Sequence, residues 1–314
     1  MMKHLAIGAA FSLLTAMGAF AAEPESCKTV RYADPGWTDI ASTNALLKAV
    51  IEPLGYKADI ATLSVPIVFR SLATSKLDIF LGNWMPAQTA TVEPLVKDGS
   101  IELIKVNLSG NRFTLAVPGY VAKAGVNSFA DLAAHSDKFE SKIYGIEAGS
   151  SLNQNLARMI EKNAYGLGKW KLIESSEQGM MAQVERAVKR QAWVVFPAWE
   201  PHPMNEQYEL TYLPGGDEYF GPNLGSAEVR TVARNGFSKE CPNLTQLLKN
   251  MAFSVELENA MMTRILVGGI SADKAAAEAL QKNPAVLDTW LKDVTTFSGE
   301  PGLAVVKTAS STVK

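Results

Sequence analysis

Large aromatic rings stand in turns that follow predicted strands. A tryptophan ring on a loop is costly to expose unless it covers something, whereas Trp170, Trp193 and Trp290 fall where core tryptophans are expected. Ligands of α/β folds collect beyond the carboxyl ends of strands. Three rings in this setting therefore favour a binding cleft. They are Trp37 in the turn 34–39, Trp84 in 82–86 and Trp199 in 196–203.

Clustered ring faces can hold a sugar, a peptide side chain or a cation. The ring quadrupole attracts a cation over its face by about 2 kcal/mol or more when the site is desolvated, and aromatic cages for quaternary ammonium are a known use of this attraction. A trimethylammonium group donates no conventional hydrogen bond. Ring faces and shape must then recognise it, which explains why rings would be clustered.

A fourth turn, 145–151, also follows a predicted strand and precedes a predicted helix. Ser150 and Ser151 stand where a helix N-cap is expected. The same geometry would let backbone amides receive a ligand carboxylate. Both interpretations remain open from the sequence.

Other reactive residue types point to structural roles. His202 beside Glu200 suggests acid–base chemistry, but a single histidine between prolines is more often structural. The run 175–177 resembles a helix cap, and Met180, Met181, Met261 and Met262 fit a core better than a metal site. We find no nucleophile turn, phosphate-binding glycine loop or zinc spacing. The sequence thus predicts no cofactor, no metal and no enzyme.

The elements that position these turns alternate between strand and helix up to about Pro242 and are almost wholly helical beyond it. Alternation predicts mostly parallel sheets covered on both faces. Two α/β lobes with a cleft between them fit the chain length better than one large sheet. Predicted strands are 29–33, 58–63, 77–82, 101–106, 113–117, 142–146, 171–174 and 193–196; predicted helices are 40–54, 66–73, 86–96, 152–163 and 179–190.

Residues 1–21 have the pattern of a cleaved secretory signal, with Lys3 ahead of an apolar run and small residues at 19 and 21. A buried N-terminal helix is the alternative. The mature protein is then periplasmic and soluble. Lys plus Arg number 30 and Asp plus Glu 32, with no basic stripe, which argues against a nucleic-acid partner.

The two cysteines, Cys27 and Cys241, both lie in the part that would be exported. An even count in an oxidising compartment suggests one disulfide, and two free buried thiols are the alternative. Neither His135 nor His202 has ligand-like spacing to a cysteine, so a metal site is not indicated.

Six ordered motifs carry a family resemblance. GWTDI, DIFLGNWMP, FTLAVP, KIYGIEAGS, ESSEQGM and WEPHPMN resemble the periplasmic choline-binding proteins of bacterial ABC importers, within the wider glycine-betaine and proline-betaine receptors. The resemblance runs from about Cys27 to Leu303. It implies a type II binding-protein fold: signal peptide 1–21, lobe 1 from 22–111 and 213–314, and lobe 2 from 112–212, each lobe a mostly parallel sheet flanked by helices.

The resemblance also implies roles for single residues. Trp37, Trp84 and Trp199 match an aromatic box around the ammonium group, and Phe113 stands where relatives carry Tyr. Asp39 matches the carboxylate that contacts the choline hydroxyl. Cys27 and Cys241 match the family disulfide. The implied mechanism is a trap in which Trp37 and Trp84 bind the cation and lobe closure brings Trp199 and Phe113 over it.

Two departures from the family pattern leave the ligand open. Phe113 lacks the phenol hydroxyl, and Ser150 stands where choline receptors often have Asn. Glycine betaine or carnitine therefore remain alternatives to choline, although a ligand carboxylate beside Asp39 would be a costly like-charge pair. The implied partner is a membrane permease coupled to an ATPase, with the protein itself a monomer. An exported enzyme using Asp39, Glu147, Glu200 or His202, and a receptor for a membrane sensor, are the competing hypotheses.

Overall fold

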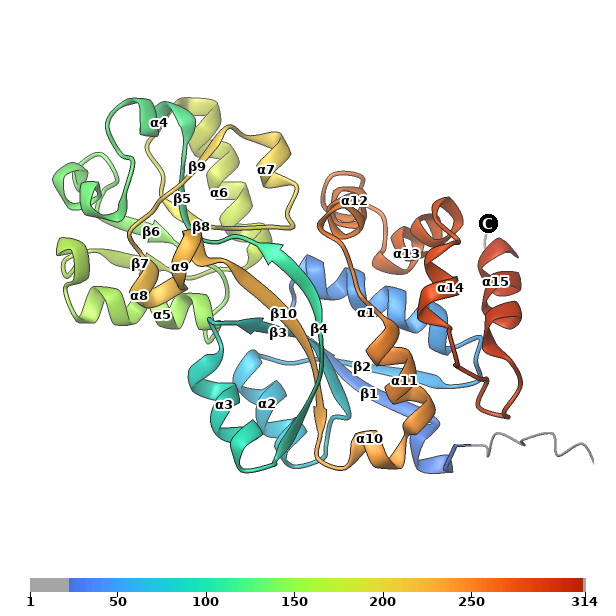
Figure 1. The fold of residues 1–314 in the computed structure, drawn as a ribbon. Coiled ribbons are helices and arrows are strands. Elements are labelled where there is room, and N and C mark those ends of the chain that lie inside the picture. Colours follow the sequence, from blue (N-terminus) through green and yellow to red (C-terminus); the bar gives the residue numbers. More distant parts are fainter. Residues whose placement is uncertain (1–22, 313–314) are drawn as a thin grey trace, which may run out of the picture.

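Two α/β lobes lie side by side in the computed structural model, which describes residues 23–312 (Figure 1). In lobe 1 a five-stranded sheet has the order β2-β1-β3-β10-β4. Strand β1 (Thr29–Asp34) runs parallel to β2 (Lys57–Thr62) and β3 (Ile79–Met85). Strand β10 (Ala227–Arg234) pairs antiparallel with β3 and with β4 (Ile101–Asn111).

Lobe 2 is built on two smaller sheets. Strand β5 (Phe113–Pro118) lies antiparallel between β8 (Phe196–Trp199) and β9 (Leu210–Tyr212). Strands β6 (Lys142–Tyr144) and β7 (Lys171–Ile173) form a parallel pair, and the Tyr144 N–H donates to the Val195 carbonyl at 3.1 Å, which joins the pair to the chain just before β8.

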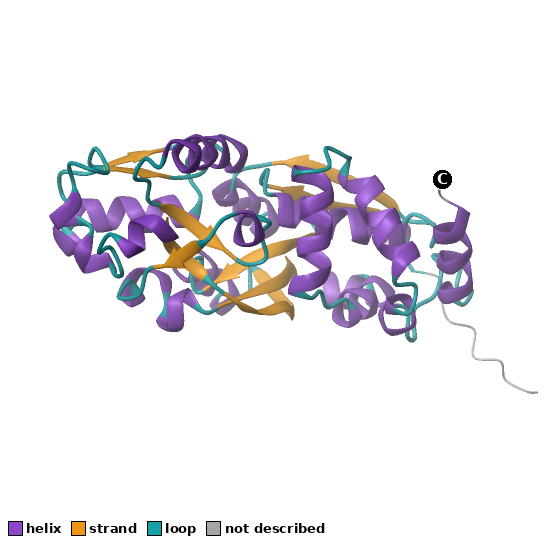
Figure 2. Cartoon of the chain, turned by 90° about the horizontal axis from the view of Figure 1, so that it is seen from above, coloured by secondary structure: helices purple, strands orange, loops and turns teal. Residues whose placement is uncertain are grey.

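Helices cover the strands of both lobes from two sides (Figure 2). The longer helices of lobe 2 bury one face, as expected for helices on a sheet, whereas the first helix of lobe 1 is buried on nearly all sides. In lobe 1 the early helices are α1 (Thr38–Ile51), α2 (Val65–Ala73) and α3 (Thr89–Lys97). Lobe 2 carries α4 (Gly119–Lys123), α5 (Ser151–Glu161), α6 (Glu177–Arg190), α7 (Met204–Gln207), α8 (Asp217–Phe220) and α9 (Pro222–Gly225).

The C-terminal part is helical, as the sequence predicts, and returns to lobe 1 (Figure 1). A break at Gly268 and Gly269 separates two of its helices. Its members are α10 (Phe237–Glu240), α11 (Pro242–Asn250), α12 (Val255–Leu266), α13 (Ala272–Lys282), α14 (Val286–Trp290) and α15 (Gly302–Thr312). No helix within residues 23–312 is both long and apolar enough to cross a bilayer.

The expectation of mostly parallel sheets is wrong in detail, because both lobes contain mixed or antiparallel pairings. The chain passes between the lobes through β4 into β5 and later through β10, which lies beside β4 (Figure 1). Strand β4 leaves lobe 1 and β10 returns to it from lobe 2, so the two neighbouring strands run in opposite directions. Alternation of strands and helices predicts parallel pairing only for neighbours joined by a crossover helix within one lobe.

The lobe bounds 22–111, 112–212 and 213–314 stay a prediction. Near the second of these bounds, the segment after β9 is held on lobe 2: Tyr165 donates its hydroxyl to the Gly215 carbonyl at 2.5 Å, and the Asn155 amide donates to the Tyr219 carbonyl at 2.8 Å. The predicted signal, 1–21, lies outside the described residues.

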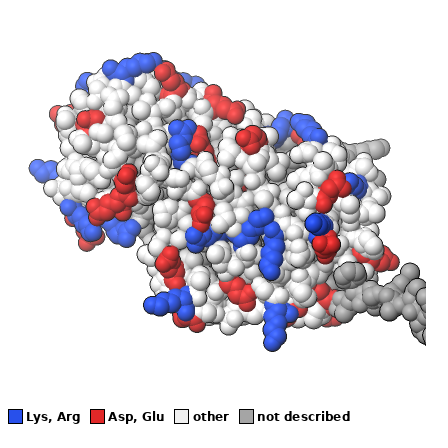
Figure 3. All heavy atoms as spheres, viewed as in Figure 1, with Lys and Arg blue, Asp and Glu red and all other residues white. Residues whose placement is uncertain are grey.

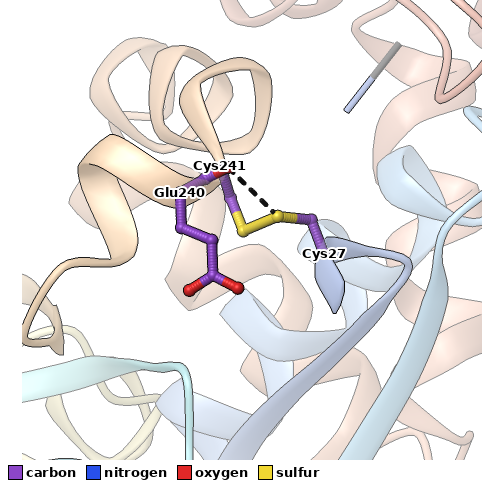
Figure 4. A group of neighbouring side chains, drawn as sticks. All are labelled: Cys27, Glu240 and Cys241. Atoms are coloured by element: carbon purple, nitrogen blue, oxygen red, sulfur yellow. Dashed lines mark hydrogen bonds between the residues drawn. A yellow bond between two sulfur atoms is a disulfide. The ribbon is translucent and has the colours of Figure 1, made fainter. Parts of the chain in front are cut away.

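Cys27 and Cys241 are joined by a disulfide with their Cα atoms 5.7 Å apart (Figure 4), within the range that disulfide geometry requires. The bond connects the first turn of the described chain to the start of α11. Since both sulfur atoms are used in this bond, the neighbouring Glu240 does not complete a metal site with them. Charges of both signs are interspersed over the face in Figure 3.

Candidate functional site

A cavity lined mostly by buried residues lies between the lobes. All six residues predicted to bind a ligand line this cavity. Lobe 1 contributes Trp37, Asp39, Trp84, Ala87 and Gln88; lobe 2 contributes Phe113, Ile146, Ser150, Ser151, Leu152 and Trp199. That the six predicted residues hold a ligand stays a prediction, but the structure brings them together from five separate segments.

The four rings are positioned by strand ends and by one helix start. Trp37 is the N-cap residue of α1, and Trp84 is the penultimate residue of β3. Phe113 and Trp199 are directly paired across β5 and β8, so their side chains leave the sheet on the same face. The rings of Trp84 and Phe113 meet across the lobes with centroids 5.6 Å apart.

Two of the three tryptophans do not lie in turns, contrary to the sequence analysis. Strand β3 continues beyond Gly82 because Trp84 and Met85 pair with Val229 and Glu228 of β10. The predicted strand 193–196 begins only at Phe196, because β5 supplies partners for residues 196–199. Both rings still stand at the carboxyl ends of strands, which is the feature that points to a ligand cleft.

Carboxylates hold the indole N–H groups of two rings. Trp84 donates to Asp39 Oδ2 at 3.1 Å, and Trp37 donates across the lobes to Glu147 Oε1 at 2.8 Å. With the N–H groups fixed in this way, the orientation of each ring in the cavity wall is fixed. Asp39 is 3% exposed, while Glu147 is half-buried.

Burial makes both carboxyl groups weak acids. Loss of water around Asp39 first, and the nearby charge of Glu177 second, raise the pKa of Asp39 to about 7. Burial likewise raises the pKa of Glu147 to about 7. Behind Asp39, burial first and the Asp39 charge second raise the pKa of Glu258 well above its ordinary value. A positive charge placed in the cavity would favour the ionised forms.

Ser150 is the N-cap of α5, where its Oγ accepts the N–H of Asn153 at 3.2 Å. The Asn153 side chain in turn accepts from the Ile146 N–H at 3.1 Å and donates to the Ile146 carbonyl at 2.8 Å. The turn before α5 is therefore fixed, and the capping interpretation of Ser150 is confirmed. Because Ser151 and Leu152 also line the cavity, the amino end of α5 faces the ligand space.

The sequence analysis missed the part played by Glu177. Ser176, not Glu177, caps α6, accepting the Gly179 N–H at 3.1 Å. Glu177 is buried and bonds to Thr38 in lobe 1 and to His202 in lobe 2. No local pattern signals contacts between residues 38, 177 and 202. The structural interpretation of His202 holds, since its ring is 1% exposed and hydrogen-bonded at both nitrogens.

None of the residues that line the described cavity carries a positive charge. Arg112, next to Phe113 in sequence, is paired with Glu200 through Nε at 2.9 Å and lies over the Tyr212 ring at 4.3 Å. The cavity thus offers ring faces, one buried carboxyl group, two serine hydroxyls, one side-chain amide and a helix amino end. These groups suit a small cation with a polar tail.

Two α/β lobes, connected by crossing strands and with an aromatic cavity between them, are the arrangement of a solute-binding protein. Residues 28–282 match the family model described as the substrate binding domain of ABC-type glycine betaine transport systems, and the chain belongs to this family.

Three solved structures resemble this one. An ABC-transporter choline binding protein in complex with choline is 48% identical, has a TM-score of 0.90, and the match covers 92% of this chain and 100% of that one. An ABC-transporter choline binding protein in an unliganded semi-closed conformation is also 48% identical, with a TM-score of 0.84, and the match covers 91% of this chain and 99% of that one. Lactococcal OpuAC, closed on glycine betaine, is 26% identical with a TM-score of 0.75 over 84% and 100%.

Proposed function

We propose that this protein captures a quaternary-ammonium compound, choline first, and delivers it to the permease of an ABC importer. The observation that carries the proposal is the cavity itself: four rings and Asp39 surround it, and its lining has no cationic side chain. Ring faces supply the attraction for the trimethylammonium group. Asp39 supplies an acceptor for a hydroxyl at the other end of the ligand.

Closure of the lobes completes the site in this proposal. Trp37 and Trp84 belong to lobe 1 and receive the cation in the open protein. Phe113 and Trp199 then cover it from lobe 2, excluding water so that the ring–cation attraction acts in a low-dielectric space. The similarity to the choline complex, greater than to the semi-closed form, supports a closed arrangement here.

Glycine betaine or carnitine is the second candidate. The amino end of α5 at Ser150 and Ser151 favours it, because helix N-termini bind carboxylates. Asp39 opposes it, because an ionised ligand carboxylate beside a buried aspartate is a like-charge pair. We therefore rank choline ahead of both zwitterions.

Calorimetric titration of ligand-free, refolded protein with choline, glycine betaine and carnitine tests the proposal. Choline should bind one-to-one and most tightly. A Trp37→Ala, Trp84→Ala, Trp199→Ala triple variant should bind at least about a hundredfold more weakly, since each ring supplies about 1–2 kcal/mol. Trp193→Ala, outside the cavity, is the matched control. Tight binding by the triple variant would refute the aromatic box.

The setting of this activity is part of the same proposal. The protein acts in the periplasm after removal of the segment 1–21, with the Cys27–Cys241 bond formed there, and binds its permease as a monomer. Because the described cavity contains no nucleophile paired with a base, we propose no catalysis. Full recovery of choline after long incubation with purified protein would agree with this, whereas turnover would establish an enzyme.

A further inference from the structure

One buried carboxylate connects the two lobes without lining the cavity. Glu177, the first residue of α6 in lobe 2, is 1% exposed. Its Oε2 accepts the backbone N–H of Thr38 at 2.8 Å and the Thr38 hydroxyl at 3.0 Å. Thr38 begins α1 in lobe 1 and lies between Trp37 and Asp39, both of which line the cavity. Glu177 therefore binds the middle residue of the segment that presents two ligand-facing groups.

The other oxygen of Glu177 is connected through His202 to Trp199, which lines the cavity from lobe 2. The Met204 N–H donates to His202 Nδ1 at 3.0 Å, so in the neutral imidazole the proton is on Nε2, which donates to Glu177 Oε1 at 2.9 Å. The His202 ring in turn packs edge-on against Trp199 with centroids 4.9 Å apart. A continuous set of contacts thus runs from Thr38 through Glu177 and His202 to Trp199.

We infer that Glu177 is the closure latch of this protein: it fixes Trp37 and Asp39 of lobe 1 against Trp199 of lobe 2 and thereby sets how long a ligand stays bound. The inference deepens the proposed function and rests on it. Because Thr38 and Glu177 belong to different lobes, their two hydrogen bonds require the closed arrangement. When the lobes separate, the Glu177 carboxylate exchanges these bonds for water. The latch therefore acts on ligand release and not on the first encounter.

The ends of two helices surround the Glu177 carboxyl group. Glu177 lies at the amino end of α6 and touches the amino end of α1, and both helix ends carry partial positive charge. Hydrogen bonds to an ionised acceptor are stronger than those between neutral groups. In Glu177→Gln the amide oxygen can still accept from Thr38, but the amide nitrogen would face the Nε2–H of His202. Since the Met204 N–H holds His202 in this tautomer, two donors would meet.

Stopped-flow measurement of choline binding, followed by tryptophan fluorescence, tests the latch. We expect Glu177→Gln to raise the dissociation rate constant about tenfold or more, the equivalent of one lost charged hydrogen bond, and to leave the association rate constant within about twofold. Glu185→Gln, on the exposed face of the same helix, is the matched control and should change neither. Thr38→Val removes only the hydroxyl and should give a smaller rise in the dissociation rate constant. This variant also tests the latch if Glu177→Gln does not fold.

A double-mutant cycle separates a latch from a general structural role. Thr38→Val and Glu177→Gln should be non-additive in the dissociation rate constant, because both remove parts of one contact across the lobes. Additive effects, or an unchanged dissociation rate constant in Glu177→Gln, would overturn the inference. A residue that merely stabilised lobe 2 would lower the melting temperature without coupling to Thr38.

The latch can be tested even if no quaternary-ammonium compound binds, which would refute the proposed function alone. Spin labels at Lys97→Cys in lobe 1 and Lys162→Cys in lobe 2, both exposed sites, report the lobe separation of the unliganded protein. Glu177→Gln should shift the distance distribution toward the open form, and Glu185→Gln should not. Identical distributions for both variants would overturn the latch.

Discussion

Choline affinity should rise with pH between about 5 and 8, because binding brings a cation into the small cavity that Asp39 lines. Burial holds the pKa of this carboxyl at about 7 in the closed site, and an adjacent opposite charge lowers a carboxyl pKa by about 1–3 units. A group whose pKa falls on binding releases a proton, so binding strengthens as pH rises. With a fall of about 2 units, linkage gives affinity about ninefold weaker at pH 6, and about 45-fold weaker at pH 5, than at pH 8.

Titration calorimetry at pH 7 in buffers of different ionisation enthalpy measures the released proton directly. The same values of pKa give a release of about half a proton per choline bound at pH 7. Asp39→Asn should remove most of this release; Glu147, whose pKa is also raised to about 7, accounts for what remains. A zwitterion with its carboxylate beside Asp39 should take up a proton instead. Constant choline affinity from pH 5 to 8 would refute the reasoning.

Three further substitutions or treatments have clear expected outcomes. Phe113→Tyr should bind choline severalfold more tightly, because Tyr is the better cation–π partner, as titration calorimetry will measure. Gly225→Ala should lower the free energy of unfolding by at least about 3 kcal/mol in denaturant titration, because Gly225 has φ +71° and a Cβ there would lie 1.9 Å from the Phe113 carbonyl oxygen. Reduction of the Cys27–Cys241 bond should lower the same free energy by about 5 kcal/mol, since the bond closes a loop of 214 residues.

Local patterns in the sequence predicted the positions of helices better than the pairing of strands. The helix α6 was predicted as 179–190 and is Glu177–Arg190, because amphipathic spacing is a property of neighbouring residues. The direction of β5 was not predictable in this way. It depends on a chain crossing between lobes and on pairing with strands about 80 and 100 residues later along the chain. Mixed sheets therefore replaced the mostly parallel sheets that alternation predicts.

Side-chain contacts across the lobes were the least predictable feature. Trp37 could be predicted as a site residue because it follows a predicted strand, and Asp39 because its motif resembles that of the choline-binding family. Glu177 offers no such signal: from sequence it belongs to the run 175–177 that resembles a helix cap, and its partners Thr38 and His202 are 139 and 25 residues away. Only lobe closure brings the three together.

The rings and the carboxylates divide the task of recognition. Ring faces attract any trimethylammonium group and do not distinguish choline from betaine. Discrimination must then come from the acidic groups around the cavity. Asp39 and Glu147 receive indole N–H bonds, and Glu177 is hydrogen-bonded to the start of α1 and to His202. Burial and the Asp39 charge raise the pKa of Glu258 well above its ordinary value. A cation in the cavity favours the ionised form of Asp39, the one carboxyl group in its lining, whereas a zwitterion brings a second negative charge into the same buried space.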